Sequence, residues 1–344
     1  MAGKMKLQGE VVLEYMSNDT YKDLPSKTLA RLIYNQNKAL FPSEESVRTT
    51  VRAIRGKSGS RKRRTAAVMI SPELPNGHYA NKFDVPNPFN LPDSDDVEWL
   101  PFDIAKSITR LLILSDVHLP YHNIQALTLA LKYGKDNGAN GVLLNGDILD
   151  FYGLSRYEKD PRKRKFSDEL QMGRDFIALL RREFDGIPIY FKVGNHEARY
   201  ESFLRLKAPE LLGISEFQID NLLRFGEHGV ELITDDRIIR AGKLSILHGH
   251  EFGRSIFSPV NPARGAYMRS KENVIVGHHH QTSSHMEKSL NGDVIGAWST
   301  GCLCEMHPAY ARINKWNHGF AFVEIESDGT FEVSNMSIIN GKVR

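Results

Sequence analysis

Carboxylate, amide and imidazole side chains follow five short apolar segments of this 344-residue chain. Together these ligand types favour borderline divalent metals such as Mn, Fe, Zn or Ni. Seven of the side chains are candidate ligands, which is more than one ion needs. We therefore expect two divalent ions about 3.5–4 Å apart, with one carboxylate bridging them. The candidate metal ligands are Asp116, His118, Asp147, Asn195, His248, His278 and His280.

The spacing inside each block favours one shared site. Residues two apart in an extended chain point to the same side, which would bring Asp116 beside His118 and His278 beside His280. Glycine precedes three of the candidate ligands, and glycine allows a tight turn where the backbone approaches a site closely. These three ligands are Asp147, Asn195 and His278.

The apolar segments before these blocks predict strands, with helices expected at residues 123–135 and 168–184. This alternation is typical of a layered α/β domain, in which the carboxyl ends of parallel strands meet at one edge. After residue 230, strands separated by turn signals replace the long helices. The predicted strands before the five blocks are 111–114, 142–144, 187–193, 244–247 and 274–276.

The chain divides into three predicted zones. Residues 1–65 form a basic helical module, with one helix near 27–34 and a second opened by Ser43 as its N-cap. Residues 66–107 form a Pro-rich linker or wrapping segment, and residues 108–344 form the domain that carries the five blocks. The two N-terminal helices are closely spaced, as in a helical hairpin or a helix-turn-helix.

Charge is distributed unevenly along the chain. Residues 1–64 hold 14 Lys and Arg against 6 Asp and Glu, whereas the remainder holds 31 against 36. Such a basic segment favours a nucleic-acid partner, and the alternative is a solvated helix face with a flexible tail. No aromatic residue interrupts the basic run, so the sequence does not indicate a preference for single strands. The candidate nucleic-acid contacts are Arg48, Arg52, Arg55, Arg61, Lys62, Arg63 and Arg64.

Several classes of protein are disfavoured. The two cysteines, Cys302 and Cys304, are too few for a disulfide framework. The longest apolar runs are too short for a membrane span, and the first residues lack the pattern of a signal peptide. We therefore expect a cytoplasmic protein without a membrane partner, and the sequence leaves its oligomeric state open.

The five blocks in order, Asp-x-His, Gly-Asp-x-x-Asp, Gly-Asn-His-Glu, His-Gly-His and Gly-His-x-His, resemble the calcineurin-like metallophosphoesterase superfamily across about residues 108–300. Segments 116–122 and 317–321 also look like phage- or prophage-type members. The resemblance implies a four-layer αββα sandwich, here with the small N-terminal all-α module added. It implies metal one on Asp116, His118, Asp147 and His280, and metal two on Asp147, Asn195, His248 and His278.

The resemblance also implies a reaction. A hydroxide bridging the two metals would attack the phosphorus atom, with His196 as general acid or electrophile. Asp150 would either orient His196 or cap the following loop. Mn is the expected ion in vitro, and Fe, Zn, Ni and Mg are alternatives. Candidate substrate contacts are Asn195, His122, His250 and Arg156.

The expected activity is hydrolysis of phosphodiester or phosphomonoester bonds in nucleic acid, with DNA favoured. A small-molecule nucleotide phosphodiesterase or phosphatase is one alternative, and a DNA-binding regulator with an accessory phosphoesterase domain is another. Protein phosphatases of the superfamily carry Arg directly after Gly-Asp-x-x-Asp, whereas this chain has Phe151. That departure disfavours a protein phosphatase.

Overall fold

A computed structural model describes residues 2–18, 21, 24–55, 99–155, 165–253, 260–308 and 311–344. The chain forms two compact units, Met1–Glu98 and Trp99–Arg344, and each is considered by itself. Residues 56–98, which include most of the predicted Pro-rich segment, lie outside the described ranges. None of the described helices is long and apolar enough to cross a membrane.

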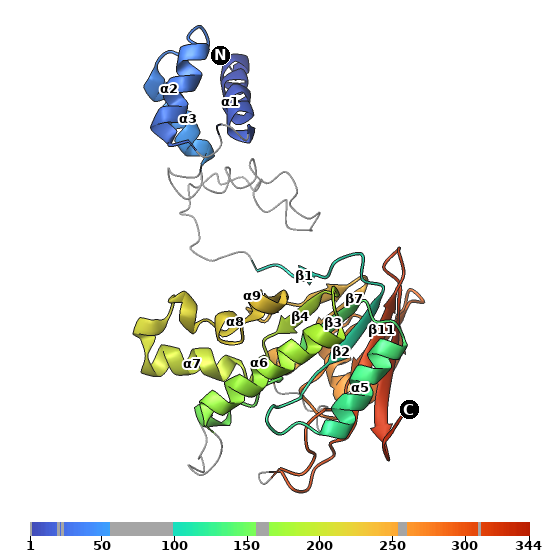
Figure 1. The fold of residues 1–344 in the computed structure, drawn as a ribbon. Coiled ribbons are helices and arrows are strands. Elements are labelled where there is room, and N and C mark those ends of the chain that lie inside the picture. The colour runs from blue at the N-terminus through green and yellow to red at the C-terminus, as the bar shows by residue number, and fades with distance from the viewer. Residues whose placement is uncertain are drawn as a thin grey trace. The chain divides into compact units, whose positions relative to one another are not determined.

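The described part of the first unit is helical (Figure 1). Its helices are α1 (Ala2–Ser17), α2 (Ser26–Gln36) and α3 (Glu44–Ile54). Ser43 caps α3 as predicted, because its hydroxyl accepts the N–H of Ser46 at 3.2 Å. The apolar stripe of α3 is buried against the other two helices, in a small core that contains Val12, Leu29, Ala30, Ile33, Phe41, Val47, Val51 and Ile54.

The second unit, here called the catalytic unit, contains a seven-stranded sheet. Strands β2 to β5 run parallel, and β11 to β13 extend the sheet from β2 in antiparallel fashion. The strand order is β13 (Lys342–Val343), β12 (Phe331–Ile339), β11 (His318–Ile325), β2 (Arg110–Leu114), β3 (Gly141–Asn145), β4 (Ile189–Lys192) and β5 (Val230–Ile233).

A six-stranded sheet faces the first one. Its central strands β7, β8 and β10 are parallel, while β6 and β9 pair in antiparallel fashion with β7 and β10. The strand order is β1 (Phe102–Asp103), β6 (Ile239–Ala241), β7 (Leu244–Leu247), β8 (Val274–Val276), β10 (Val294–Ser299) and β9 (Ser283–Lys288).

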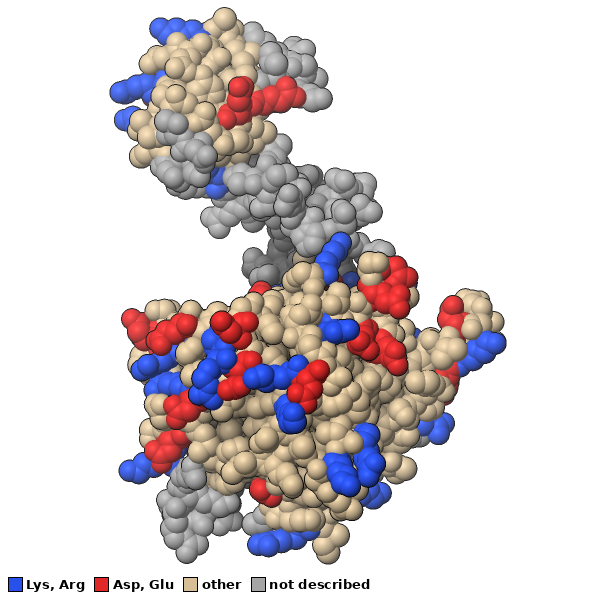
Figure 2. Space-filling view, turned by 45° about the vertical axis from the view of Figure 1, so that its right-hand side comes forward, with Lys and Arg blue, Asp and Glu red and all other residues tan. Residues whose placement is uncertain are grey.

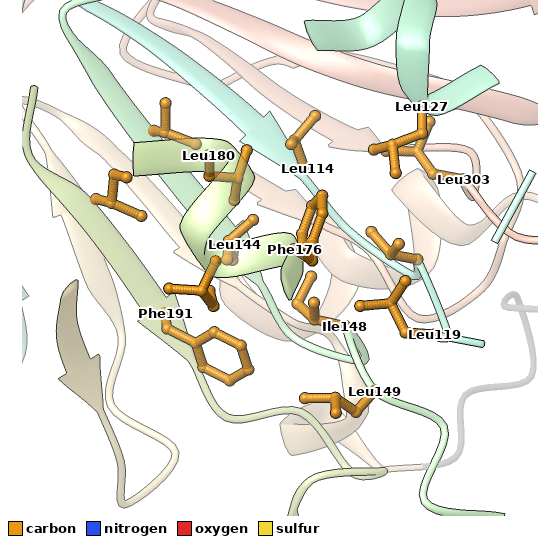
Figure 3. Close-up of a cluster of buried hydrophobic side chains, with 14 of the residues drawn as sticks. Leu114, Leu119, Leu127, Leu144, Ile148, Leu149, Phe176, Leu180, Phe191 and Leu303 are labelled. Carbon is orange, nitrogen blue, oxygen red and sulfur yellow. The ribbon is translucent and has the colours of Figure 1, made fainter. Parts of the chain in front are cut away.

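Alternating side chains of the strands build the layers, since successive residues of a strand point to opposite faces. Leu111 and Ile113 of β2 lie between the sheets with Ile246 and Ile275. Leu112 and Leu114 face the helices α5 (Ile124–Asp136) and α6 (Phe166–Glu183) on the outer face. Figure 3 shows part of that outer core, where each buried Leu or Phe side chain contributes about 1.5–3 kcal/mol.

The fourth layer is α10 (Pro262–Ser270), whose Ala263 and Ala266 pack on Leu247, Val274 and Val276 of the six-stranded sheet. The catalytic unit therefore has the αββα layers that the family resemblance implies. Figure 1 shows α5 and α6 across the sheet that holds β2, β3 and β4. All five predicted ligand blocks follow strands β2, β3, β4, β7 and β8, at their carboxyl ends.

Some boundaries differ from the predicted ones. The helix expected at 168–184 spans Phe166–Glu183, and the strand expected at 187–193 is limited to Ile189–Lys192. The catalytic unit begins at Trp99, whose indole N–H donates to the carbonyl of Asp235 at 2.7 Å. Short helices α7 (Ala198–Lys207), α8 (Ile219–Leu222) and α9 (Phe225–His228) connect β4 to β5.

Candidate metal centre

Two ligand loops meet at Asp116. The Ser115 hydroxyl and the His278 backbone N–H both donate to Asp116 Oδ2, at 2.6 and 2.9 Å. The other oxygen, Oδ1, therefore faces the imidazoles, 3.1 Å from His280 Nε2 and 4.0 Å from His118 Nε2. His118 Nε2 and His280 Nε2 lie 3.2 Å apart, a spacing at which both nitrogens could bind one ion.

Asp147 joins this group to a second one. Its Oδ2 lies 3.2 Å from His248 Nε2 and 3.9 Å from His118 Nε2, while Oδ1 accepts the His196 N–H at 2.8 Å. Ligand atoms lie within 4.8 Å of one another both in the set Asp116, His118 and Asp147 and in the set Asp147, His248 and His278. A carboxylate shared by two such sets fits the bridging position.

Unpartnered polar atoms show that the centre fits divalent ions. Asn195 Oδ1 and His278 Nδ1 are buried and have no hydrogen-bond partner among the described residues. An unsatisfied buried polar group costs about 1–3 kcal/mol, and metal coordination would satisfy both. Asn195 lies beside Asp147, because its neighbours Gly194 and His196 both approach that carboxylate.

The predicted reason for the pairing of ligands within a block is wrong. Asp116, His118, Asp147, His278 and His280 have φ between 50° and 65°, so these residues are not in an extended chain. Left-handed backbone is unfavourable at such residues, by about 1–3 kcal/mol each. This conformational cost falls on five candidate ligands. Such a concentration of backbone strain is typical of functional sites.

The glycines next to the ligands act as predicted. A Cβ atom on Gly146 would lie 2.5 Å from His248 Nδ1, and one on Gly277 would lie 2.7 Å from Asp116 Oδ2. A Cβ atom on Gly194 would lie 2.4 Å from Asp147 Oδ1. Each loop can therefore approach its neighbour only because a side chain is missing at that position.

Two buried carboxylates that the sequence analysis missed hold the ligand loops. Glu197 accepts the backbone N–H groups of Asp147, Ile148, Leu149 and Gly194 at 2.8–3.0 Å. Its position in the Gly-Asn-His-Glu block was the available signal.

Glu251 acts similarly at the next loop. It accepts the N–H groups of His248 and Gly249 at 3.1 and 2.6 Å, and it forms a buried ion pair with Lys192 at 3.0 Å. Because Lys192 belongs to the seven-stranded sheet, this pair ties the His248 loop of one sheet to the other. Lys192 and Glu251 are far apart in a chain with many Lys and Glu, so no sequence signal could have linked them.

His196 and Asp150 lie next to the ligands. Asp150 Oδ1 lies 3.1 Å from Nδ1 of both His118 and His196, so one carboxylate orients the two rings. His196 Nδ1 also contacts the Asp150 carbonyl at 2.8 Å. Its Nε2 lies 3.8 Å from Asp147 Oδ2 and 2.9 Å from Arg199 Nη2. Arg199 is a further residue that the sequence analysis missed.

The carboxylates and imidazoles of the centre shift one another's pKa. Burial raises the pKa of Asp147, but the nearby positive charge of His248 lowers it well below its usual value. Burial lowers the pKa of His248 and of His280, yet Asp147 and Asp116 respectively raise each to about 10. The two buried carboxylates thus require positive charge beside them.

The predicted substrate contacts occupy different places. Asn195 lies between Gly194 and His196, which both approach Asp147, whereas His250 Nε2 contacts Asp236 Oδ1 at 3.3 Å. His122 lines a cavity of about 260 Å³ between α5 and α6 and pairs through its backbone with Cys304. Arg156 lies outside the described residues.

The two cysteines are buried and free. Cys304 Sγ lies 3.9 Å from His280 Nδ1, the ring nitrogen that faces away from Asp116. The His280 ring also packs on the Trp316 ring, with the two ring centroids 4.1 Å apart. Cys304 and Trp316 therefore help to fix the orientation of a candidate ligand.

The candidate nucleic-acid residues on α3 differ in their contacts. Arg52 is exposed, while Arg48 is paired with Glu45 at 3.1 Å and Arg55 donates to the Ser26 hydroxyl at 3.2 Å. The remaining predicted contacts, Arg61, Lys62, Arg63 and Arg64, lie outside the described residues.

Curated relatives of this chain come from bacteriophages. The "Gene 54 protein" of Mycobacterium phage L5 is 30% identical over 229 residues, which cover 63% of this chain and 89% of the relative. The protein of the same name from Mycobacterium phage D29 is 30% identical over 231 residues, with 64% and 90% covered. The predicted likeness to phage members is therefore confirmed.

Solved structures give more remote matches. A single mutant of Vps29 from Entamoeba histolytica has TM-score 0.38 and 13% identity, covering 68% of this chain and 96% of that chain. A dimetal phosphatase from Danio rerio has TM-score 0.34 and 12% identity, covering 66% and 96%.

The family assignment comes from a direct sequence match. The sequence profile of the calcineurin-like phosphoesterases matches residues 109–301, which is more than half of the chain and includes all five ligand blocks. The fold, the ligand geometry and this match agree. The chain belongs to the calcineurin-like phosphoesterase family and is a metal-dependent phosphoesterase.

Proposed function

We propose that this phosphoesterase hydrolyses phosphodiester or phosphomonoester bonds of nucleic acid, with DNA favoured over RNA. The observation that carries the proposal is a separate helical unit continued by a strongly basic stretch of chain. Residues 48–64 contain eight Lys and Arg and no Asp or Glu. Binding to the phosphate backbone of a nucleic acid needs many positive charges but no precise arrangement of them.

The arrangement of α2 and α3 supports a duplex partner. The two helices pack on each other through a shared core, and α3 exposes Thr49 and Arg52 on the face opposite that core. A second helix of such a pair fits the major groove of B-form DNA, whereas the deep major groove of A-form RNA does not admit it. In Figure 2 several Lys and Arg side chains of this unit lie along one edge of the view.

The residues of the centre supply the chemistry. Two divalent ions held by the candidate ligands would activate water and neutralise the phosphate. Asp150 orients His196, whose Nε2 faces the centre and, once protonated, could deliver that proton to a leaving oxygen. Glu197 and Glu251 keep the ligand loops fixed, so the site is organised before substrate arrives.

Charge-neutral variants of the full-length protein test the proposal. Arg52→Gln and a variant with glutamine at positions 61–64 are compared with wild type, and Lys27→Gln, an exposed lysine on α2, is the matched control. Binding of a DNA duplex, an RNA duplex and single strands is measured at several salt concentrations. Hydrolysis of end-labelled DNA and of bis(p-nitrophenyl) phosphate is measured with Mn-loaded protein.

We expect DNA cleavage by the wild type, and weaker DNA binding by the charge-neutral variants. The slope of log binding constant against log salt concentration should become shallower by about 0.9 for each phosphate that is no longer neutralised. The control and the rate on the small diester should be unchanged. Turnover of the small ester together with intact DNA in every protein would refute the nucleic-acid substrate and favour a small-molecule phosphoesterase. Strong salt-sensitive DNA binding with feeble hydrolysis of every ester would instead favour a DNA-binding regulator.

A further inference from the structure

Arg199 extends from the first turn of α7 toward the catalytic histidine. Its Nη1 donates to the backbone carbonyl of Asp150 at 2.8 Å, and its Nη2 lies 2.9 Å from His196 Nε2. Since a guanidinium has only donors, His196 Nε2 must be the acceptor in this contact. His196 Nδ1 then carries the hydrogen and donates it to Asp150.

These contacts place the guanidinium at the edge of the metal centre. His196 Nε2, the atom that Arg199 contacts, lies 3.8 Å from Asp147 Oδ2. That carboxylate is shared by the two sets of candidate ligands. A phosphoryl group held over the two sets would therefore have Arg199 and His196 beside it.

Arg199 has unused capacity to bind an anion. Among the described residues, no carboxylate forms an ion pair with it, whereas Arg205 on the same helix is paired with Glu201 at 2.6 Å. Each terminal nitrogen of Arg199 carries two hydrogens, and each makes one contact, so one hydrogen on each remains for a further acceptor. The guanidinium is half-buried, which strengthens its attraction for a negative charge.

The residue directly after Asp150 does not bring a positive charge to the centre. Phe151 occupies that position, and its ring is fully buried in the core under α6. The Asp150 carbonyl instead accepts a hydrogen bond from Arg199, which lies in the helix that follows β4. The chain thus brings one guanidinium to the end of the Gly-Asp-x-x-Asp block from elsewhere in the sequence.

We propose that Arg199 is the phosphate-binding side chain of this enzyme, holding a non-bridging oxygen of a phosphate mono- or diester beside His196. Its two terminal nitrogens provide the fork that suits two oxygens of one phosphate. The proposal rests on the phosphoesterase activity of the family and not on a nucleic-acid substrate. A small ester and inorganic phosphate are therefore sufficient probes.

Three full-length variants test the proposal in Mn-loaded protein. Arg199→Ala removes the guanidinium, Arg199→Lys keeps a positive charge without the fork, and Arg205→Ala removes a charge from the exposed face of α7 as the matched control. The readouts are the dissociation constant of inorganic phosphate, kcat and KM for p-nitrophenyl phosphate and for bis(p-nitrophenyl) phosphate, the bound Mn per chain, and the melting temperature.

We expect Arg199→Ala to weaken phosphate binding about 10- to 100-fold while the Mn content stays at the wild-type value. The loss in kcat/KM should be larger for the monoester, because its dianion gains more from a guanidinium than the monoanionic diester does. Arg199→Lys should recover part of the phosphate affinity, and Arg205→Ala should match wild type in every readout.

Two results would overturn the proposal. Phosphate affinity within twofold of wild type in folded, Mn-loaded Arg199→Ala would show that the guanidinium does not bind the phosphate. A loss of bound Mn in both Arg199 variants would show that Arg199 only supports the ligand loops through Asp150 and His196. If the alanine variant does not fold, Arg199→Lys provides the test. A lysine variant with the phosphate affinity and the Mn content of wild type would refute a role for the guanidinium fork.

Discussion

Glu197 is the residue at which a small change should have a large and calculable effect. Glu197→Gln keeps the shape of the side chain but replaces one carboxylate oxygen by an NH₂ group. Each oxygen accepts two backbone N–H groups, Ile148 and Leu149 on Oε1 and Asp147 and Gly194 on Oε2. Either orientation of the amide therefore removes two hydrogen bonds and leaves two buried donors without an acceptor.

Two opposing effects set the size of the stability loss in Glu197→Gln. Hydrogen bonds to a charged group are worth about 1.5–3 kcal/mol each, so losing two costs roughly 3–6 kcal/mol. Burial, followed by the charge of Asp147, raises the pKa of Glu197, so removing its charge recovers part of this loss. We expect the free energy of unfolding to fall by about 3 kcal/mol, and metal affinity to fall about 10- to 100-fold because the Asp147 loop loosens.

The assay can follow the catalytic unit alone, since all three tryptophans, Trp99, Trp298 and Trp316, lie in it. Urea unfolding in chelator is followed by tryptophan fluorescence, and Mn binding is measured by calorimetry. Glu201→Gln is the control, one turn further along α7, exposed and paired with Arg205. Equal unfolding free energy and equal Mn affinity in the two variants would refute the role assigned to Glu197.

Three further predictions concern catalysis, pH and metal removal. His196→Ala should keep its bound metal, measured by elemental analysis, and lose about 100-fold or more in kcat on a small diester; loss of less than threefold would contradict a proton-donating role. Burial, followed by the charge of Asp150, raises the pKa of Glu169 from 4.5 to about 7. Because the folded-state pKa is the higher one, the stability associated with neutral Glu169 is present below pH 4.5 and is lost as the pH rises through 7. The free energy of unfolding, measured in urea at pH 5 and at pH 8, should therefore decrease between the two pH values. Glu169→Gln should make this decrease smaller by roughly 1–3 kcal/mol, whereas the exposed control Asp168→Asn should leave it unchanged. Removing metal with chelator should lower stability, and restoring Mn at 100 times its dissociation constant should return about 2.7 kcal/mol for each bound ion; an unchanged melting temperature would contradict metal binding by the folded state.

The layers and the position of the site follow from local sequence patterns. Short apolar segments ended by Asp, Asn or His predict strands whose carboxyl ends meet, and the structure brings the ligands after β2, β3, β7 and β8 together there. The first helix, Ala2–Ser17, is absent from the sequence-based expectation because its apolar residues do not form a single stripe.

Two of the supporting residues could not be predicted. Glu251 and Arg199 act on backbone or side chains of other loops, and only the folded loops bring these groups together. The left-handed backbone at Asp116 and His280 also gives no sequence signal, because neither residue is a glycine. Loop geometry is set by the surrounding structure, which holds the ligands in conformations that their residue types disfavour.

The central claim is that Asp147 joins two metal sites in one catalytic centre. The direct test measures bound metal and hydrolysis of bis(p-nitrophenyl) phosphate while Mn is added back to chelator-treated wild type and Asp147→Asn. We predict that wild-type activity reaches its plateau at two Mn per chain, and that Asp147→Asn binds less metal and is inactive. Full turnover in Asp147→Asn, or a plateau at one Mn per chain in wild type, would contradict a shared two-metal centre.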